Sequence, residues 1–272
     1  MATIIHREPM SPFVALTIAG SDPSGGAGIQ ADLKTFHQRG VYGESVITLV
    51  TVQNTLRVSA VECLSPDLVA SQLDAVLEDI PPAAAKTGAL GNLEIVRVVA
   101  EKARDFKFPL IVDPVMISKH GQPLMTGPAR TAFAELLLPK AFLVTPNLHE
   151  AGELAGMAVH DVATMKEAAI RIAALGAQAV LVKGGHLDGD AVDILYWRGE
   201  SLEYRSPRIH TAHTHGTGCT YSACITAELA KGRDLADAVA VAKRYITNAI
   251  RTNPGLGRGS GPVNHHAQAE DS

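Results

Sequence analysis

The chain has 272 residues, of which 46% are hydrophobic and 19% are charged, a balance that supplies a buried core and excludes disorder along the body of the chain. A formal net charge of -4 argues against a nucleic-acid-binding protein, because phosphate backbones demand a clustered excess of Lys and Arg. The first residues lack the apolar core of a signal peptide, and no later run approaches the roughly 18 apolar residues that a membrane helix needs. We therefore expect a cytoplasmic enzyme with no membrane or nucleic-acid partner.

From Phe13 onwards, short apolar runs alternate with amphipathic stretches, a pattern that predicts an α/β fold with a mainly parallel sheet covered by helices. The predicted strands are almost entirely apolar, as strands buried on both faces should be; they cover residues 13–20, 45–53, 109–113, 141–145 and 179–184. Helical spacing of apolar residues predicts helices over 28–40, 66–80, 93–106, 164–176, 218–230 and 235–250. Residues 191–209 resemble a hairpin that turns at 198–200.

No linker, repeat or low-complexity tract divides the chain, so we predict one domain over residues 13–266. Residues 1–12 are expected to be flexible, and residues 267–272 are expected to form a polar tail. The three cysteines, Cys63, Cys219 and Cys224, form no CxxC pair. This pattern indicates neither a disulfide framework nor a four-thiolate metal site, and it fits a reducing compartment.

The segment HTHGTGCT places Gly216 and Gly218 where a helix is predicted to begin. Free backbone N–H groups and the helix dipole make such a position an anion site, to which Thr217 could add a hydroxyl donor. The two glycines alone fit a simple turn and cap equally well. Cys219 in the first turn favours the functional interpretation, because a thiol at a helix N-terminus has a lowered pKa and can serve as a base.

A second glycine-rich segment, AGSDPSGGAGIQADLK, follows the first predicted strand and leads into a helix that contains Asp32. It is neither a dinucleotide-binding GxGxxG motif nor a Walker A motif, and no GxxxxGK[ST] match occurs in the chain. If ATP is bound, a different architecture must hold its phosphates. On its own, the segment is equally well a plain connection between strand and helix.

Polar residues follow three predicted strands: Asp113 the first, Asn147 and Glu150 the second, and Lys183 the third. Ligands of open α/β sheets bind outside the carboxyl ends of strands. Two carboxylates and a lysine there suit Mg²⁺ and phosphate together, although each alone could be a helix cap or a surface charge. The pairs at 213/215 and 265/266 are interpreted as loop histidines, since a zinc site needs three or four convergent ligands.

Taken together and in this order, these segments resemble the ribokinase-like superfamily, and most specifically the hydroxymethylpyrimidine and phosphomethylpyrimidine kinases of thiamine biosynthesis. The resemblance covers roughly 15–265 and is carried by ALTIAGSDPSGGAGIQADLKTF, TVQNT, KTGALG, DPVM, LLPKAFLVTPNLHEA, VLVKGGH, HTHGTGCT and GPVNHH. It implies a three-layer ribokinase-like sandwich. It also implies phosphorylation of 4-amino-5-hydroxymethyl-2-methylpyrimidine by ATP and Mg²⁺, first to the monophosphate and then to the diphosphate, by a homodimer.

The resemblance further implies roles for individual residues. The pyrimidine would be held by residues that match Gly20, Asp32, Gln53 and Val115, and the Gln53 amide can both donate and accept. Cys219 stands where sugar kinases of the superfamily carry a catalytic Asp, so it would act as the base, and the amides of 216–219 would form the anion hole. Asp113 and Glu150 match residues that organise Mg²⁺, and the segments that serve the nucleotide contain Asn147, Lys183, Thr217 and Lys243.

One residue departs from the family pattern: Ala89 stands in KTGAL where many members have Met. A smaller side chain leaves room over the ring. The alternative is therefore a kinase of pyridoxal, whose ring also carries a hydroxymethyl arm. A non-catalytic ligand-binding or regulatory homologue is a third hypothesis. The position and glycines of residues 118–127 suggest a lid over the site.

Overall fold

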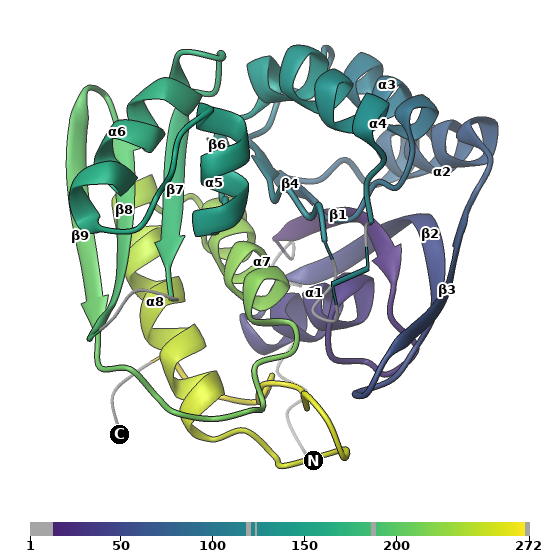
Figure 1. Ribbon diagram of the computed structural model, residues 1–272. Coiled ribbons are helices and arrows are strands. Elements are labelled where there is room, and N and C mark those ends of the chain that lie inside the picture. The colour runs from purple at the N-terminus through teal and green to yellow at the C-terminus, as the bar shows by residue number, and fades with distance from the viewer. Residues whose placement is uncertain (1–12, 118–120, 123, 186–188, 270–272) are drawn as a thin grey trace, which may run out of the picture.

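The computed structural model describes residues 13–117, 121–122, 124–185 and 189–269. The expected flexible segment 1–12 lies outside the described residues, as do 118–120 and 123 of the suggested lid and the last three residues of the expected tail. The described part of the chain forms three layers, with helices on both faces of one sheet (Figure 1). The predicted α/β fold is confirmed.

The sheet of the described residues has nine strands in the order β3-β2-β1-β4-β5-β6-β7-β8-β9. Strands β2, β1, β4, β5, β6 and β7 run parallel, while β3 at one edge and β8 and β9 at the other pair antiparallel. Their bounds are β1 Val14–Ser21, β2 Tyr42–Gln53, β3 Val58–Cys63, β4 Ala84–Thr87, β5 Leu110–Val112, β6 Leu143–Val144, β7 Ala179–Gly184, β8 Ala191–Trp197 and β9 Glu200–Ser206.

The helices form two layers, which are separated by the sheet (Figure 1). One layer holds α1 Gly28–Gln38, α7 Thr217–Ala230 and α8 Leu235–Arg251. The other holds α2 Pro66–Asp79, α3 Leu93–Lys102, α4 Gly127–Ala132, a π turn at Phe133–Leu137, a 3-10 turn at Leu138–Lys140, α5 Leu148–Ala155 and α6 Val162–Ala173.

Side chains of β1 pack alternately against the two helix layers, because successive side chains of a strand point to opposite faces of the sheet. Leu16 and Ile18 pack in the core with α2 and α3, whereas Ala15 packs with Phe36 of α1 and with α7. On that second face, Ile111 of β5 contributes to the core that contains α8. Central strands buried on both faces are therefore apolar throughout, as the sequence predicts.

The main difference between the predicted and the observed elements is that the prediction omitted several short ones. Strand β7 matches its prediction, and the β8–β9 hairpin turns at Arg198 and Gly199, which have φ of 53° and 82°. The prediction omitted β3 and β4, each of six residues or fewer, and α5, which a capping box begins at Asn147. Within the segment expected to be a polar tail, Ala267 and Ala269 are buried in the core beside α8. Among the described residues, no helix is long and apolar enough to cross a membrane.

Candidate active site

A cavity of about 570 Å³ opens at the carboxyl ends of the parallel strands. Asp22 follows β1, Gly88 follows β4, Asp113 follows β5 and Gly185 follows β7, and all four line the cavity. Every site residue predicted from the sequence lines it too, with the exception of Asp32. The sheet topology thus brings together residues that are up to about 200 positions apart, as expected for an open α/β sheet.

The start of α7 forms one wall of this cavity. Gly216 has a φ of 79°, and a Cβ atom built on it would lie 1.7 Å from the carbonyl oxygen of Gly26. Only glycine fits there, because any other residue would be strained in the left-handed conformation and its Cβ atom would clash with Gly26. The helix has no side-chain cap, so backbone N–H groups of its first turn face the cavity and can bind an anion.

Cys219 lies in this first turn and lines the cavity. Burial raises the pKa of its thiol to about 12, and nearby Asp32 and Asp113 act in the same direction, while Lys86 and the Gly28 N–H act against it. The prediction of a lowered pKa is therefore wrong. Here the desolvation of the thiolate raises the pKa by more than the helix N-terminus lowers it.

Asp113, Lys183 and Glu150 form an adjoining wall. The Nζ atom of Lys183 lies 3.0 Å from Oδ1 of Asp113, which also accepts a hydrogen bond from Thr145, while Oδ2 accepts one from Ser222. Burial alone would raise the pKa of Asp113, but Lys183 and Lys86 hold it below its usual value. Asp113 is thus an ionised carboxylate at the end of β5.

Glu150 begins α5 together with Asn147 in a reciprocal capping box. The Asn147 N–H donates to Oε2 of Glu150 at 2.9 Å, and the Glu150 N–H donates to Oδ1 of Asn147 at 3.0 Å. Burial, followed by repulsion from Asp113, raises the pKa of Glu150 to about 7 although Lys183 lowers it. Two neighbouring carboxylates whose negative charges disfavour each other suit a cation such as Mg²⁺, even though the described residues hold no cluster of three or more His, Cys, Asp or Glu side chains.

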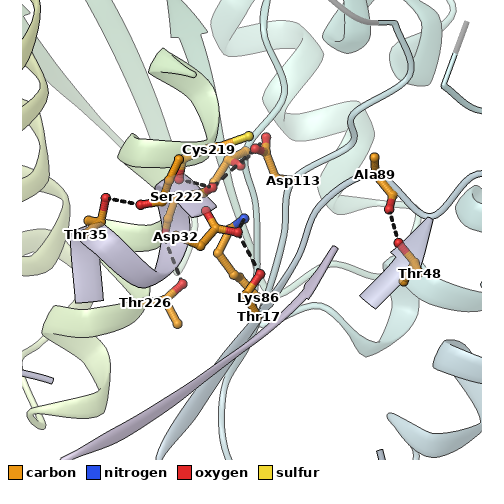
Figure 2. A network of polar contacts seen from close by, with 12 residues as sticks. Thr17, Asp32, Thr35, Thr48, Lys86, Ala89, Asp113, Cys219, Ser222 and Thr226 are labelled. Atoms are coloured by element: carbon orange, nitrogen blue, oxygen red, sulfur yellow. Dashed lines mark hydrogen bonds and ion pairs between the residues drawn. The ribbon is translucent and has the colours of Figure 1, made fainter. Parts of the chain in front are cut away.

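Lys243 and Asp32 serve mainly to support the cavity. Lys243 lines it, but its ammonium group already donates to Asp193 at 2.7 Å and to the Ala191 carbonyl at 3.0 Å. Asp32 is fully buried and accepts hydrogen bonds from Thr17 at 2.6 Å and Lys86 at 2.8 Å, below Cys219 (Figure 2). The prediction that Asp32 contacts the substrate is therefore corrected.

The remaining predicted residues lie on the third side of the cavity. Gly20 is the penultimate residue of β1, Gln53 ends β2, and Val115 follows β5. Ala89 follows β4, and its carbonyl accepts a hydrogen bond of 2.6 Å from Thr48 (Figure 2). These side chains are small, apolar or amide-bearing, so this end of the cavity suits a neutral heterocycle better than phosphate.

Comparisons with known proteins agree with this geometry. Residues 22–264 match the family described as phosphomethylpyrimidine kinase. The chain belongs to this family. It is 44% identical over 266 residues to the hydroxymethylpyrimidine/phosphomethylpyrimidine kinase of Bacillus subtilis, covering 97% of this chain and 98% of that protein. It is also 49% identical over 268 residues to the thiamine biosynthesis bifunctional protein ThiED of Geobacter sulfurreducens, covering 98% of this chain but only 55% of that protein.

Solved structures of two kinases are similar to this member of the phosphomethylpyrimidine kinase family. An ADP complex of Bacillus subtilis pyridoxal kinase has a TM-score of 0.89 and 41% identity, covering 94% of this chain and 98% of that chain. The phosphomethylpyrimidine kinase of Clostridium difficile has a TM-score of 0.79 and 46% identity, covering 88% of this chain and 99% of that chain. The fold is therefore shared with kinases named for two different substrates.

Three residues of the site escaped prediction from the sequence. Asp22 and His215 pair across the cavity wall at 2.8 Å, and Lys86 is a fully buried cation beneath Cys219. His215 was interpreted as a loop histidine with no role in the site. Its acceptor is 193 residues away, and no local pattern in the sequence predicts such a pair.

Proposed function

We propose that this chain transfers the terminal phosphoryl group of ATP to 4-amino-5-hydroxymethyl-2-methylpyrimidine, and then to its monophosphate, for thiamine biosynthesis. The observation that carries the proposal is one cavity in which the first turn of α7 with Cys219, the charged cluster of Asp113, Glu150 and Lys183, and Gln53 all face the same space. Relatives named for this activity support it over nearly their full length.

The pyrimidine would occupy the end of the cavity formed by Gly20, Gln53, Ala89 and Val115. The Gln53 amide would recognise the polar edge of the ring, and the apolar neighbours would exclude water from it. This position turns the hydroxymethyl arm towards Cys219.

The phosphates of ATP would lie between the start of α7 and Lys183. A Cβ atom on Gly218 would lie 3.3 Å from Nζ of Lys183, so a cation stands beside the free N–H groups where the transferred group must sit. Asp113 and Glu150 would hold Mg²⁺, which neutralises charge on the phosphate oxygens. Asn147 and Thr217 line the same part of the cavity, whereas Lys243 would act through Asp193 and not by direct contact.

Cys219 would orient the substrate hydroxyl group through a hydrogen bond to Sγ. With a thiol pKa of about 12, the side chain is a neutral thiol at pH 7 and accepts no second proton. Phosphoryl transfer through a loose transition state needs little proton removal before the new bond forms, so the hydroxyl proton can leave late, to an oxygen of the transferred phosphoryl group. Positioning and electrostatic stabilisation then supply most of the rate enhancement.

The test is a steady-state assay of the purified protein with MgATP, in which both the mono- and the diphosphate should form. We expect Cys219→Ala to lower kcat about 10²-fold, and Cys219→Ser, which keeps a small hydrogen-bonding group, to retain more activity. Cys224→Ala, at a buried cysteine outside the cavity, is the matched control. ATP binding without either product would reject the proposal and favour a non-catalytic homologue.

Pyridoxal is a second candidate substrate. Ala89 leaves space beside the ring position, and the ADP complex of similar fold belongs to a pyridoxal kinase. Measuring kcat/KM for both compounds decides between them, and a clear preference for pyridoxal would reverse the order. The homodimer and the cytoplasmic location stay predictions; light scattering on the eluted protein checks the first, and cell fractionation the second.

A further inference from the structure

The glycine-rich loop between β1 and α1 folds around the carboxylate of Asp22. Oδ1 accepts hydrogen bonds from the N–H and the hydroxyl group of Ser24 at 2.8 and 2.7 Å, and Oδ2 accepts from the N–H groups of Gly26 and Ala27 at 3.2 and 2.8 Å. A concave set of backbone N–H groups of this kind binds anions such as phosphate. In this loop the anion is a side chain of the protein itself.

Asp22 is held in place by its backbone as well. Its N–H donates to Oε1 of Gln30 in α1 at 2.8 Å, and its carbonyl accepts from the Gly25 N–H at 2.9 Å. The residue is only 2% exposed, and burial alone would raise the pKa of its carboxyl group, but hydrogen bonds, that from His215 first, hold the pKa well below its usual value. The side chain is therefore an ionised carboxylate in a fixed position.

The same carboxylate contacts a second loop, the one that leads into α7. Oδ2 of Asp22 lies 2.8 Å from Nε2 of His215, and because an ionised carboxylate has no hydrogen to donate, Nε2 carries the hydrogen. The His215 and Asp22 side chains are only 8% and 3% exposed, so water competes little for this bond. Gly216, the N-cap residue of α7, is the next residue of the chain.

The two loops fit against each other without space for movement. A Cβ atom on Gly26 would lie 2.5 Å from Cδ2 of His215, and one on Gly216 would lie 1.7 Å from the Gly26 carbonyl oxygen. The backbone of His215 is also fixed, because its N–H donates to the Gly261 carbonyl at 3.0 Å and its carbonyl accepts from the Val263 N–H at 3.3 Å. A displacement of the glycine-rich loop would therefore be passed on to Gly216 and to the N–H groups of the first turn of α7.

We propose that Asp22 is a positioning residue for phosphoryl transfer: as an anion built into the glycine-rich loop, it sets the position of the N–H groups at the start of α7 through its hydrogen bond to His215. The inference rests on the proposed function. Donors aimed at charge that develops in the transition state affect kcat more than the binding of the ground state. Loss of Asp22 should therefore lower kcat and leave KM nearly unchanged.

The first test compares two substitutions of Asp22 by steady-state kinetics. Asp22→Ala removes both acceptors and should lower kcat about 10²-fold, the loss that a misplacement of about 1 Å can cause. Asp22→Asn can place its single oxygen at the position of Oδ2, where it still accepts from Gly26, Ala27 and His215. It loses only the bond from the Ser24 N–H, so kcat should fall about 10-fold at most.

Asp161→Ala is the matched control for these substitutions. Asp161 accepts from the N–H and the hydroxyl group of Thr164, both at 2.7 Å, as Asp22 does from Ser24, but it caps α6 on the surface. Its kcat should equal that of the unchanged protein. An unchanged kcat in Asp22→Ala, a rise in KM that accounts for the whole loss of kcat/KM, or an Asp22→Asn variant as slow as Asp22→Ala overturns the inference.

The second test asks whether Asp22 acts through His215. His215→Leu removes the donor at Nε2, and made alone it should lower kcat to a similar extent as Asp22→Ala, which keeps the test decisive if that variant does not fold. Residues that act as one unit give losses that do not add. The double variant Asp22→Ala/His215→Leu should therefore be no slower than the slower single variant. Losses that multiply to about 10⁴-fold overturn the inference.

The third test separates this inference from the proposed function. Calorimetry with MgADP, in the presence and absence of aluminium fluoride as a mimic of the transferred phosphoryl group, requires no turnover. The unchanged protein should bind MgADP more tightly with aluminium fluoride, and Asp22→Ala should lose this gain while binding MgADP alone as before, which also shows that it is folded.

If the proposed function fails, the unchanged protein forms neither phosphorylated product, yet the gain from aluminium fluoride and its loss in Asp22→Ala are still observed. No gain in the unchanged protein, or a gain that Asp22→Ala retains in full, overturns the inference about Asp22.

Discussion

Two walls of the cavity differ in the groups that they present: one presents backbone N–H groups, and the other presents charged side chains. The wall built from the glycine-rich loop and the start of α7 relies on backbone: Gly216 lies against Gly26, and N–H groups point inwards. The adjoining wall relies on side-chain charge: Lys183 pairs with Asp113 at 3.0 Å, and both influence the pKa of Glu150. The first wall should tolerate changes of charge better than added atoms, and the second should tolerate changes of shape better than a lost charge.

The largest effect is expected where an atom is added to the backbone wall. Gly216→Ala would place a methyl group 1.7 Å from the Gly26 carbonyl, which displaces the N–H groups of α7 and should lower kcat about 10²- to 10³-fold. Gly232→Ala is the matched control, because Gly232 has a φ of 81° with nothing within 4 Å of its Cβ position. It carries only the backbone strain of about 1–2 kcal/mol. Equal kcat values for the two variants would refute the role of the close contact.

The second-largest loss of kcat is expected when a charge is removed from the adjoining wall. Lys183→Met leaves Asp113 and Glu150 facing each other without a cation and removes a partner of the phosphates, so kcat should fall about 10²-fold. Lys166→Met is the control, because Lys166 pairs with Glu203 at 2.7 Å on the surface, where ion pairs contribute little. Steady-state kinetics with varied ATP measure both. A kcat for Lys183→Met close to that of the control would contradict the charge-based account.

A smaller effect on kinetics is expected at the end of the cavity where we propose that the ring binds. Ala89→Met fills space beside the ring with a flexible apolar side chain, which should raise the preference for the aminopyrimidine about 10-fold, the lower end of what an apolar pocket can discriminate. Comparison of kcat/KM for the two substrates checks this. If the preference does not move, Ala89 does not limit the choice of substrate.

The smallest expected effect is a change in the pH dependence of thermal stability at His265. Burial, with Lys34, His266 and His215 nearby, lowers the pKa of His265 to about 4. Below about pH 6.5 this histidine therefore binds a proton in the unfolded chain but not in the folded chain. As a result, the free energy of unfolding decreases as the pH falls from about 6.5 towards 4. At pH 5, His265→Gln should melt about 2–4 °C above the unchanged protein, which corresponds to about 1 kcal/mol.

Above pH 7 the advantage of His265→Gln should vanish, since both states are then neutral at this position. His160→Gln, at an exposed histidine, is the control and should show no such dependence on pH. Parallel melting curves that keep the same offset at pH 5 and pH 8 would show that burial of His265 does not govern the effect.

The sequence predicts the order of most strands and helices because their apolar patterns are local. It misses β4 because four residues, Ala84–Thr87, carry too little pattern. It predicts that Gln53, Asp113, Lys183 and Cys219 lie at strand ends or at the start of a helix, and all four line the cavity. Properties that depend on residues distant in the sequence could not be predicted. The raised pKa of Cys219, for example, comes from burial and from charges supplied by other segments.

The contact between His215 and residues 261–263 has a consequence for the order in which the enzyme can mature. The bond from the His215 N–H to the Gly261 carbonyl and the bond from the Val263 N–H to the His215 carbonyl involve a segment that is translated after α8. Domains begin to fold during synthesis, and most of the sheet can assemble on the ribosome. The anion hole cannot reach its final shape until residues 261–263 have left the ribosome, so activity should not appear before that point.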